Sequence, residues 1–121
     1  MKLRDIEMLM LYNPDSTIGK QALAFAQTFS NKINSYAFNT YKISTTRWQD
    51  LLEMMNMKPK ELLDKSLPLY QEKVKGHEYD DEGWLLILTN HPELIKGVIA
   101  VKGNKAIYCQ TPSEIFKLSQ V

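Results

Sequence analysis

The sequence from residue 7 to residue 15 reads Glu-Met-Leu-Met-Leu-Tyr-Asn-Pro-Asp. A short apolar run that stops at Asn-Pro-Asp is typical of a buried β-strand followed by a turn. Ser16 or Thr17 is then placed to cap a helix, because a side-chain oxygen there accepts a free N–H group of the first turn. Apolar residues recur at three- and four-residue steps from Ala22 to Ile33, which predicts an amphipathic helix that runs to about residues 31–34.

The next stretch, residues 36–43, alternates between apolar and polar side chains and predicts a second strand. A strand, a helix and a strand joined by a long crossover favour a parallel pair. Helical patterns then occupy about residues 45–95, with Pro59 in a first turn and Asp80 or Asp81 as a cap.

The last third of the chain predicts a hairpin and a helix. Gly103-Asn104 separates two β-rich runs, residues 98–101 and 106–109, and such a pair favours a tight turn because hairpin turns need positive φ. Thr111-Pro112 then opens a final helix. The fold class is therefore α/β, with strand-helix-strand, a helical insert, a β-hairpin and a C-terminal helix.

Composition narrows the class of protein. The 121 residues carry a net charge of +1, which gives no general attraction to nucleic acid or to a membrane surface. No apolar run is long enough to span a bilayer, and residues 1–7 do not resemble a signal peptide. Cys109 is the single cysteine, so an internal disulfide, a Cys-x-x-Cys pair and a thiolate zinc site are excluded. We expect a cytoplasmic protein.

Three local features receive structural interpretations. Cys109 ends a predicted strand, where a lone cysteine is expected to be a buried small hydrophobe. Met54, Met55 and Met57 are expected to fill gaps within the helical insert. The acidic stretch at residues 77–82 is predicted to be a solvated loop and helix cap, so the sequence predicts no metal site.

Four stretches resemble the arsenate reductase/Spx family, which has a thioredoxin-like fold. Residues 12–16, Tyr-Asn-Pro-Asp-Ser, are similar to the Asn-Pro-x-Cys loop of the family, and residues 58–63 are similar to the Pro-x-Glu-Leu-Leu segment of its helical insert. Residues 91–96 resemble the stretch before its Arg-Pro-Ile strand. Residues 104–107 and 112–114 resemble its closing hairpin and helix. The resemblance implies one thioredoxin-like domain over residues 1–121.

The chemistry-bearing positions of the family are replaced in this chain. The reactive cysteine falls on Ser16, and the second cysteine of the Cys-x-x-Cys members falls on Gly19. The three arginines fall at about Asp64, Gly97 and Gln110, with Lys65 adjacent to the first. The cis-proline falls on Val98. Because a cis bond costs about 2.5–4 kcal/mol before a residue other than proline, we predict a trans Gly97–Val98 bond, with the φ freedom of Gly97 absorbing the change of path.

Ser16 is interpreted as a helix cap and not as a nucleophile, because a serine hydroxyl needs a positioned base and no histidine lies near it in the sequence. No catalytic residue is predicted. The first turn remains a candidate anion site, formed by Ser16, Thr17, Gly19 and Lys20, since a helix N-terminus offers free N–H groups and partial positive charge.

The resemblance and the replacements together predict a binding or regulatory protein without thiol-redox activity and without a resident cofactor. Spx-type relatives bind RNA polymerase, so the resemblance implies a protein partner, whereas the sequence sets no oligomeric state. The alternative is a glutathione-dependent reductase or transferase in which glutathione supplies the sulfur and Ser16 orients it.

Overall fold

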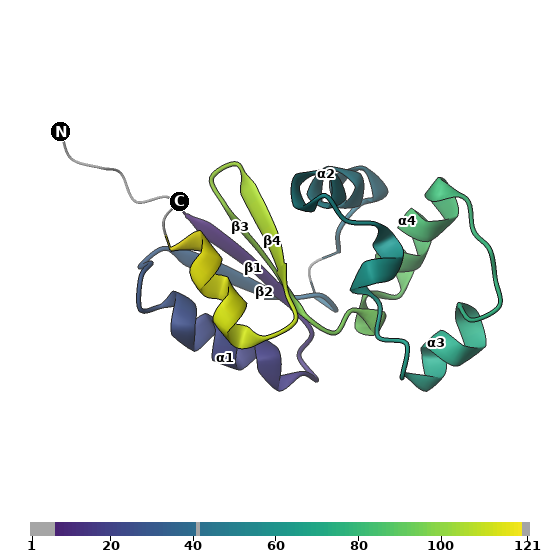
Figure 1. Cartoon of the computed structure of the whole chain (residues 1–121), viewed down its shortest axis with the longest axis horizontal. Helices are drawn as coiled ribbons and strands as arrows, with labels where there is room; N and C mark the ends of the chain where they lie inside the picture. The colour runs from purple at the N-terminus through teal and green to yellow at the C-terminus, as the bar shows by residue number, and fades with distance from the viewer. Residues whose placement is uncertain (1–6, 41, 120–121) are drawn as a thin grey trace.

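The computed structural model describes residues 7–40 and 42–119 of the chain (Figure 1). Its elements follow the predicted order of strand, helix, strand, helical insert, hairpin and helix. In chain order they are β1 (Met8–Tyr12), α1 (Thr17–Ala26), β2 (Ile33–Ala37), α2 (Thr45–Met55), the 3-10 helix η1 (Pro59–Leu62), α3 (Pro68–Lys73), α4 (Asp81–Asn90), the 3-10 helix η2 (Pro92–Leu94), β3 (Val98–Lys102), β4 (Lys105–Cys109) and the 3-10 helix η3 (Pro112–Leu118).

The four strands form one mixed sheet in the order β2-β1-β3-β4. Strands β1 and β2 are parallel, as predicted, and β3 runs antiparallel to both β1 and β4. Gly103 has φ 63° in the two-residue turn between β3 and β4, which confirms the hairpin read from Gly103-Asn104.

Two boundaries predicted along the first half of the chain are wrong. The helix α1 ends at Ala26, where Thr28 N–H and the Thr28 hydroxyl both donate to the Phe25 carbonyl and close a turn. Ile33, which the apolar spacing predicts on the helical face, instead begins β2 opposite Met8. Strand β2 therefore covers residues 33–37 and not 36–43. Position 41 of the predicted strand lies outside the described residues.

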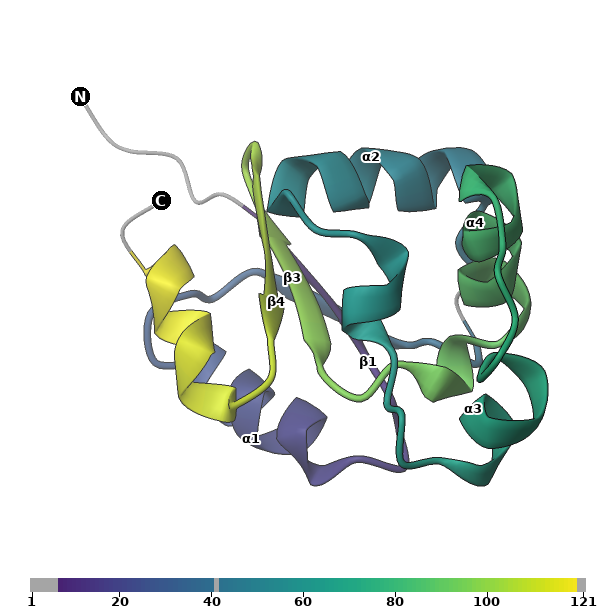
Figure 2. The same ribbon diagram turned by 45° about the vertical axis from the view of Figure 1, so that its right-hand side comes forward.

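Alternation along the strands divides the core into two layers. Met8, Met10, Val98 and Ala100 face α1 and η3, and the residues between them face the helical insert. Figure 2 shows α1 and η3 on one side of the sheet and α2 with the rest of the insert on the other side. Since both faces are covered, the central strands β1 and β3 are apolar on both sides, whereas the edge strand β2 has no buried residue. Cys109 is fully buried under α1 and η3, as predicted.

The helical insert builds its own apolar interior around Trp48, Leu51, Leu62 and Leu88, each of which is 1% exposed or less. Met55 and Met57 pack against this interior as expected, but Met54 is 37% exposed, so its predicted gap-filling role is wrong. Among the described residues, none of the helices is both long and apolar enough to cross a bilayer.

Candidate functional site

Ser16 occupies the place where the resemblance puts a reactive cysteine, at the start of α1. Its backbone is extended (φ −106°, ψ 137°), and its Oγ accepts a hydrogen bond of 3.3 Å from Ile18 N–H. This is the N-cap geometry predicted for Ser16 or Thr17, and Ser16 is the residue that adopts it. The Ile18 contact is the hydrogen bond that Ser16 Oγ makes within the described residues. None of the described histidine or carboxylate side chains is hydrogen-bonded to the hydroxyl as a base would be.

The rest of the candidate anion site combines groups that could bind an anion with a glycine that has a packing role. Within the described part of the chain, the N–H groups of Thr17 and Gly19 have no hydrogen-bond partner, and Lys20 is exposed in the same turn. Gly19 has a packing role: a Cβ added there would lie 2.8 Å from the Cβ of Tyr12, so glycine lets α1 approach β1. This contact explains why a glycine stands where the resemblance puts a second cysteine.

Asn13 connects the first loop by hydrogen bonds to the segment before β3, which lies about 80 residues further along the chain. Its Nδ2 donates to the carbonyls of Glu93 (3.3 Å) and Ile95 (3.2 Å), while its Oδ1 accepts from Asp15 N–H (2.9 Å). The contact brings the start of α1 beside the chain that leads into Gly97. Sequence reasoning treated Asn13 only as a turn residue and missed this role.

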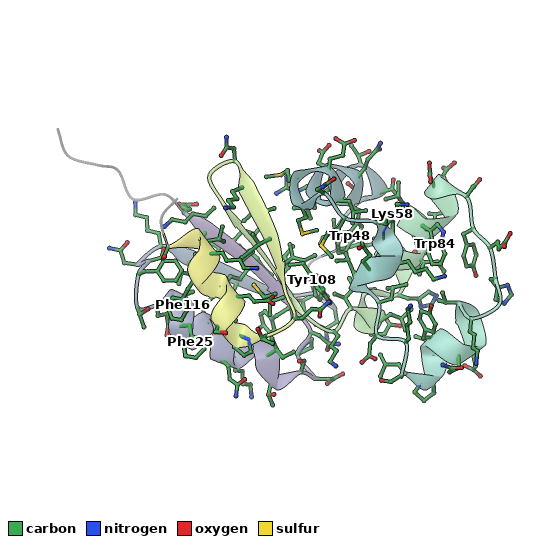
Figure 3. The ribbon with its side chains drawn as sticks, in the orientation of Figure 1. Phe25, Trp48, Lys58, Trp84, Tyr108 and Phe116 are labelled. Carbon is green, nitrogen blue, oxygen red and sulfur yellow. The ribbon has the colours of Figure 1, made fainter. Side chains whose placement is uncertain are left out.

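The backbone N–H group before β3 is hydrogen-bonded to a side chain of the protein itself. Gly97 N–H donates to the hydroxyl of Tyr108 at 2.9 Å, and that hydroxyl donates to the carbonyl of Leu62 at 3.1 Å. Tyr108 thus connects β4, the start of β3 and the helical insert through one oxygen atom. Figure 3 shows Tyr108 at the end of the hairpin, on the side that faces the insert.

The Gly97–Val98 bond is trans, because the described residues contain no cis peptide bond, and this prediction is confirmed. The reason given for Gly97 is wrong, since Gly97 does not have a positive φ. A Cβ at this position would clash with the Cys109 carbonyl oxygen and would lie 2.8 Å from the ring of Tyr108. Glycine is required for the close approach of β4 and not for its φ freedom.

Asp64, at the position of the first arginine, is a negative charge beside Tyr108. The hydroxyl and N–H of Ser66 donate to Asp64 Oδ1 at 2.6 and 3.0 Å. The Ser66 hydroxyl bond is the main cause that lowers the pKa of Asp64, and the charge of Lys96 adds to it. Burial chiefly raises the pKa of Tyr108, and the charge of Asp64 raises it further. An ionised Asp64 disfavours an oxyanion where an arginine would attract one.

Cys109 is the last residue of β4, and Gln110 follows it. Gln110 is exposed, and its N–H donates to the Glu114 carboxylate at 2.9 Å. Burial raises the pKa of the Cys109 thiol to about 12, and the nearby Glu114 contributes in the same direction. A thiol with that pKa is almost fully protonated at neutral pH, so it is a poor nucleophile.

Solved structures with the same fold include arsenate reductases and proteins related to them. An arsenate reductase from Vibrio cholerae matches with a TM-score of 0.85 over 95% of this chain and 99% of its own, at 16% identity. A candidate arsenate reductase from Yersinia pestis matches with a TM-score of 0.83 over 93% and 100%, at 17% identity. An arsenate-reductase-related protein from Brucella melitensis gives 0.67 over 99% and 100%, at 8% identity. The chain has the thioredoxin-like fold of the arsenate reductases.

No family model and no curated protein matches the sequence. Within the arsenate-reductase fold, the chain brings three of the positions expected to carry chemistry to one end of the sheet: Ser16 through the Asn13 contact, and Gly97 and Asp64 through Tyr108. The described side chains there include no activated nucleophile. No group of three or more described His, Cys, Asp or Glu side chains is arranged to hold a metal ion.

Proposed function

We propose that this chain is a binding or regulatory protein built on the arsenate-reductase fold, with neither arsenate reductase nor thiol–disulfide exchange activity. The observation that carries the proposal is the hydrogen bond from Gly97 N–H to the Tyr108 hydroxyl. In the family that the sequence resembles, the backbone before the third strand is the edge against which a substrate sulfur or peptide docks. In this chain the hydroxyl of Tyr108 accepts the hydrogen bond of the Gly97 N–H group at the corresponding place.

Two further features support the proposal. The residue at the nucleophile position is a serine whose oxygen caps α1, and a serine hydroxyl has no accessible anion at neutral pH. The position of the first arginine carries Asp64, whose lowered pKa keeps it ionised near neutral pH. A site in which the Ser16 hydroxyl caps the helix and Asp64 carries a negative charge is suited neither to nucleophilic attack by sulfur nor to strong binding of arsenate.

The test is an activity measurement on the purified protein with arsenate, and separately with a protein disulfide, using glutathione or thioredoxin as electron donor. We expect turnover equal to the background without enzyme, both for the natural protein and for Ser16→Ala. Turnover that disappears in Ser16→Ala would refute the proposal. If this turnover occurred with glutathione but not with thioredoxin as electron donor, it would favour a glutathione-dependent enzyme in which Ser16 orients the thiol.

The weak anion site at the start of α1 is part of the same proposal. The free N–H groups of Thr17 and Gly19 and the charge of Lys20 favour phosphate, whereas the charge of Asp15, next to the N-cap residue Ser16, opposes it. In a phosphate titration followed by amide NMR, we expect small shifts centred on residues 16–20. Shifts centred elsewhere, or none at high phosphate concentration, would remove the site.

A further inference from the structure

A small pocket lies where the connections that follow β1 and β2 leave the sheet on opposite sides. The chain after β1 leads to α1 on one side of the sheet, and the chain after β2 leads to α2 on the other side (Figure 2). In open α/β sheets, ligands bind outside the carboxyl ends of the strands at such a switch point. Phe38 and Asn39, which follow β2, line the pocket. Glu93 also lines it, and the carbonyl of Glu93 accepts a hydrogen bond from Asn13, which follows β1.

The size and the floor of this pocket fit a compact ligand. Its volume is about 320 Å³, at the lower end of the roughly 300–1,000 Å³ found for small-molecule sites. Phe38 and Trp48 line it and stack on each other with their ring centroids 6.1 Å apart, and Leu88 lines it as well. All three side chains are 3% exposed or less, so the floor is apolar and is held in place by the core.

The wall of the pocket at the end of α4 carries negative charge. The carbonyls of residues 88–90 accept no hydrogen bond from the described part of the chain, and Pro92 has no N–H group to donate to them. The last turn of α4 contains no basic residue that would offset the partial negative charge of this helix end. The carboxylate of Glu93 adds a full charge, and its Oε2 lies 3.3 Å from Nδ1 of His91. This wall favours a cationic group of a ligand.

The wall of the pocket at the start of α2 carries positive charge. Ile43 and Trp48 line the pocket from either side of the N-cap residue Ser44, so the N-terminus of α2 lies at this wall. The first turn of α2 contains no acidic residue that would offset the partial positive charge of this helix end. Lys42 lines the pocket and is exposed, and no carboxylate oxygen of the described residues lies within 4.0 Å of its ammonium group. This wall favours an anionic group of a ligand.

We propose that this pocket binds a small zwitterion, an α-amino acid with an apolar side chain. The ligand carboxylate meets Lys42 and the start of α2, its ammonium group meets Glu93 and the free carbonyls at the end of α4, and its side chain lies on the apolar floor. A ligand with a single charge would leave one of the two walls without a partner, whereas a zwitterion satisfies both. The inference goes beyond the proposed function, because the pocket includes neither residues 16–20 nor Tyr108.

The test is a titration of the intact protein with L-leucine, followed by amide NMR, beside two analogues that each lack one charge. Isocaproate keeps the carboxylate without the ammonium group, and isoamylamine keeps the ammonium group without the carboxylate. We expect saturable shifts with L-leucine that centre on Asn39, Ile43 and residues 88–91, and weaker binding of each analogue by on the order of tenfold. No shifts at millimolar L-leucine, shifts centred on another surface, or equal binding of either analogue would overturn the proposal.

Matched variants separate the two walls from net charge. Lys42→Gln and Glu93→Gln should each weaken L-leucine binding on the order of tenfold, because each loses a hydrogen bond between charged groups. Lys32→Gln and Glu72→Gln remove the same charges from exposed residues outside the pocket and should change binding by about twofold or less. Equal losses in a pocket variant and its control would overturn the proposal. Amino-acid binding and reductase turnover are measured separately, so the pocket can fail while the proposed function stands, and the reverse.

Discussion

Tyr108 is the residue that connects β4, the start of β3 and the helical insert at the candidate site. Its hydroxyl accepts from Gly97 N–H and donates to the Leu62 carbonyl, and both partners are buried. A buried amide or carbonyl left without a partner is costly, so the tyrosine stabilises the fold at the start of β3. Under the proposed function, the same side chain would both stabilise the fold and prevent docking.

Removing this hydroxyl should therefore destabilise the protein. We expect Tyr108→Phe to lower the free energy of unfolding by about 1–3 kcal/mol, because Gly97 N–H and the Leu62 carbonyl lose their partner. Tyr79→Phe is the matched control: Tyr79 donates a single bond of 2.7 Å to the Lys73 carbonyl in an exposed setting, and its loss should cost about 0.5 kcal/mol. Urea unfolding of both variants measures the difference, and equal losses would show that the phenol is not a buried bridge.

At the scale of elements, the start of α1 resembles the start of α2 more than it resembles a reactive site. Both helices begin after a serine in extended conformation, and the side chain of each serine accepts a first-turn N–H, at 3.3 Å from Ser16 and 3.1 Å from Ser44. Nothing in α2 suggests catalysis. The common geometry assigns Ser16 the same structural role.

Substitutions at the two caps should accordingly behave alike. Ser16→Ala and Ser44→Ala should each cost about 1 kcal/mol of stability, and Ser16→Asp and Ser44→Asp should each retain most of it, because aspartate is an equally good cap. Thermal or urea unfolding of the four variants provides the comparison. A stabilised Ser16→Ala, beside a destabilised Ser44→Ala, would indicate a strained functional serine and not a cap.

Over the whole molecule, titration of buried groups predicts alkaline instability. Burial raises the pKa of Cys109 from 9.0 to about 12, and also raises the pKa of Tyr108. The folded state therefore holds these protons after the unfolded state has lost them. The resulting stabilisation is complete below pH 9 and is lost as the pH rises toward 12.

The measurement is the free energy of unfolding against pH for the natural protein and for Cys109→Ala. The natural protein should lose stability between pH 9 and 12 more steeply than the variant, which lacks the thiol titration. Lysines titrate in the same range in both proteins, so the difference between the two slopes is the relevant quantity. Identical slopes would mean that the thiol is not buried in solution.

The fold could be predicted from sequence because its signals are local. The apolar run before Asn13-Pro14 gave β1, and Gly103 gave the hairpin. The start of β2 was missed because its first residue, Ile33, also continues the helical spacing of α1, and only pairing with Met8 decides between the two. Boundaries set by a distant strand are not contained in a local pattern.

The site was predicted only in part, for the same reason. Ser16 and Gly97 were found because their positions align with a known motif. Asn13 and Tyr108 were missed because their partners lie about 80 and 46 residues away in the sequence. Tyrosine is common in strands, so its presence in β4 gives no signal of a special role. Its contact with Gly97 follows only once β3 and β4 are paired.

The amide of Gly97 offers the most direct test that the docking edge is occupied. In NMR spectra of the intact protein, we predict that this amide exchanges slowly with solvent, that it does not shift on titration with oxidised glutathione, and that its protection falls in Tyr108→Phe. A Gly97 amide that exchanges rapidly in the natural protein, and that shifts in a saturable manner with glutathione, would contradict the account and favour a glutathione-dependent enzyme.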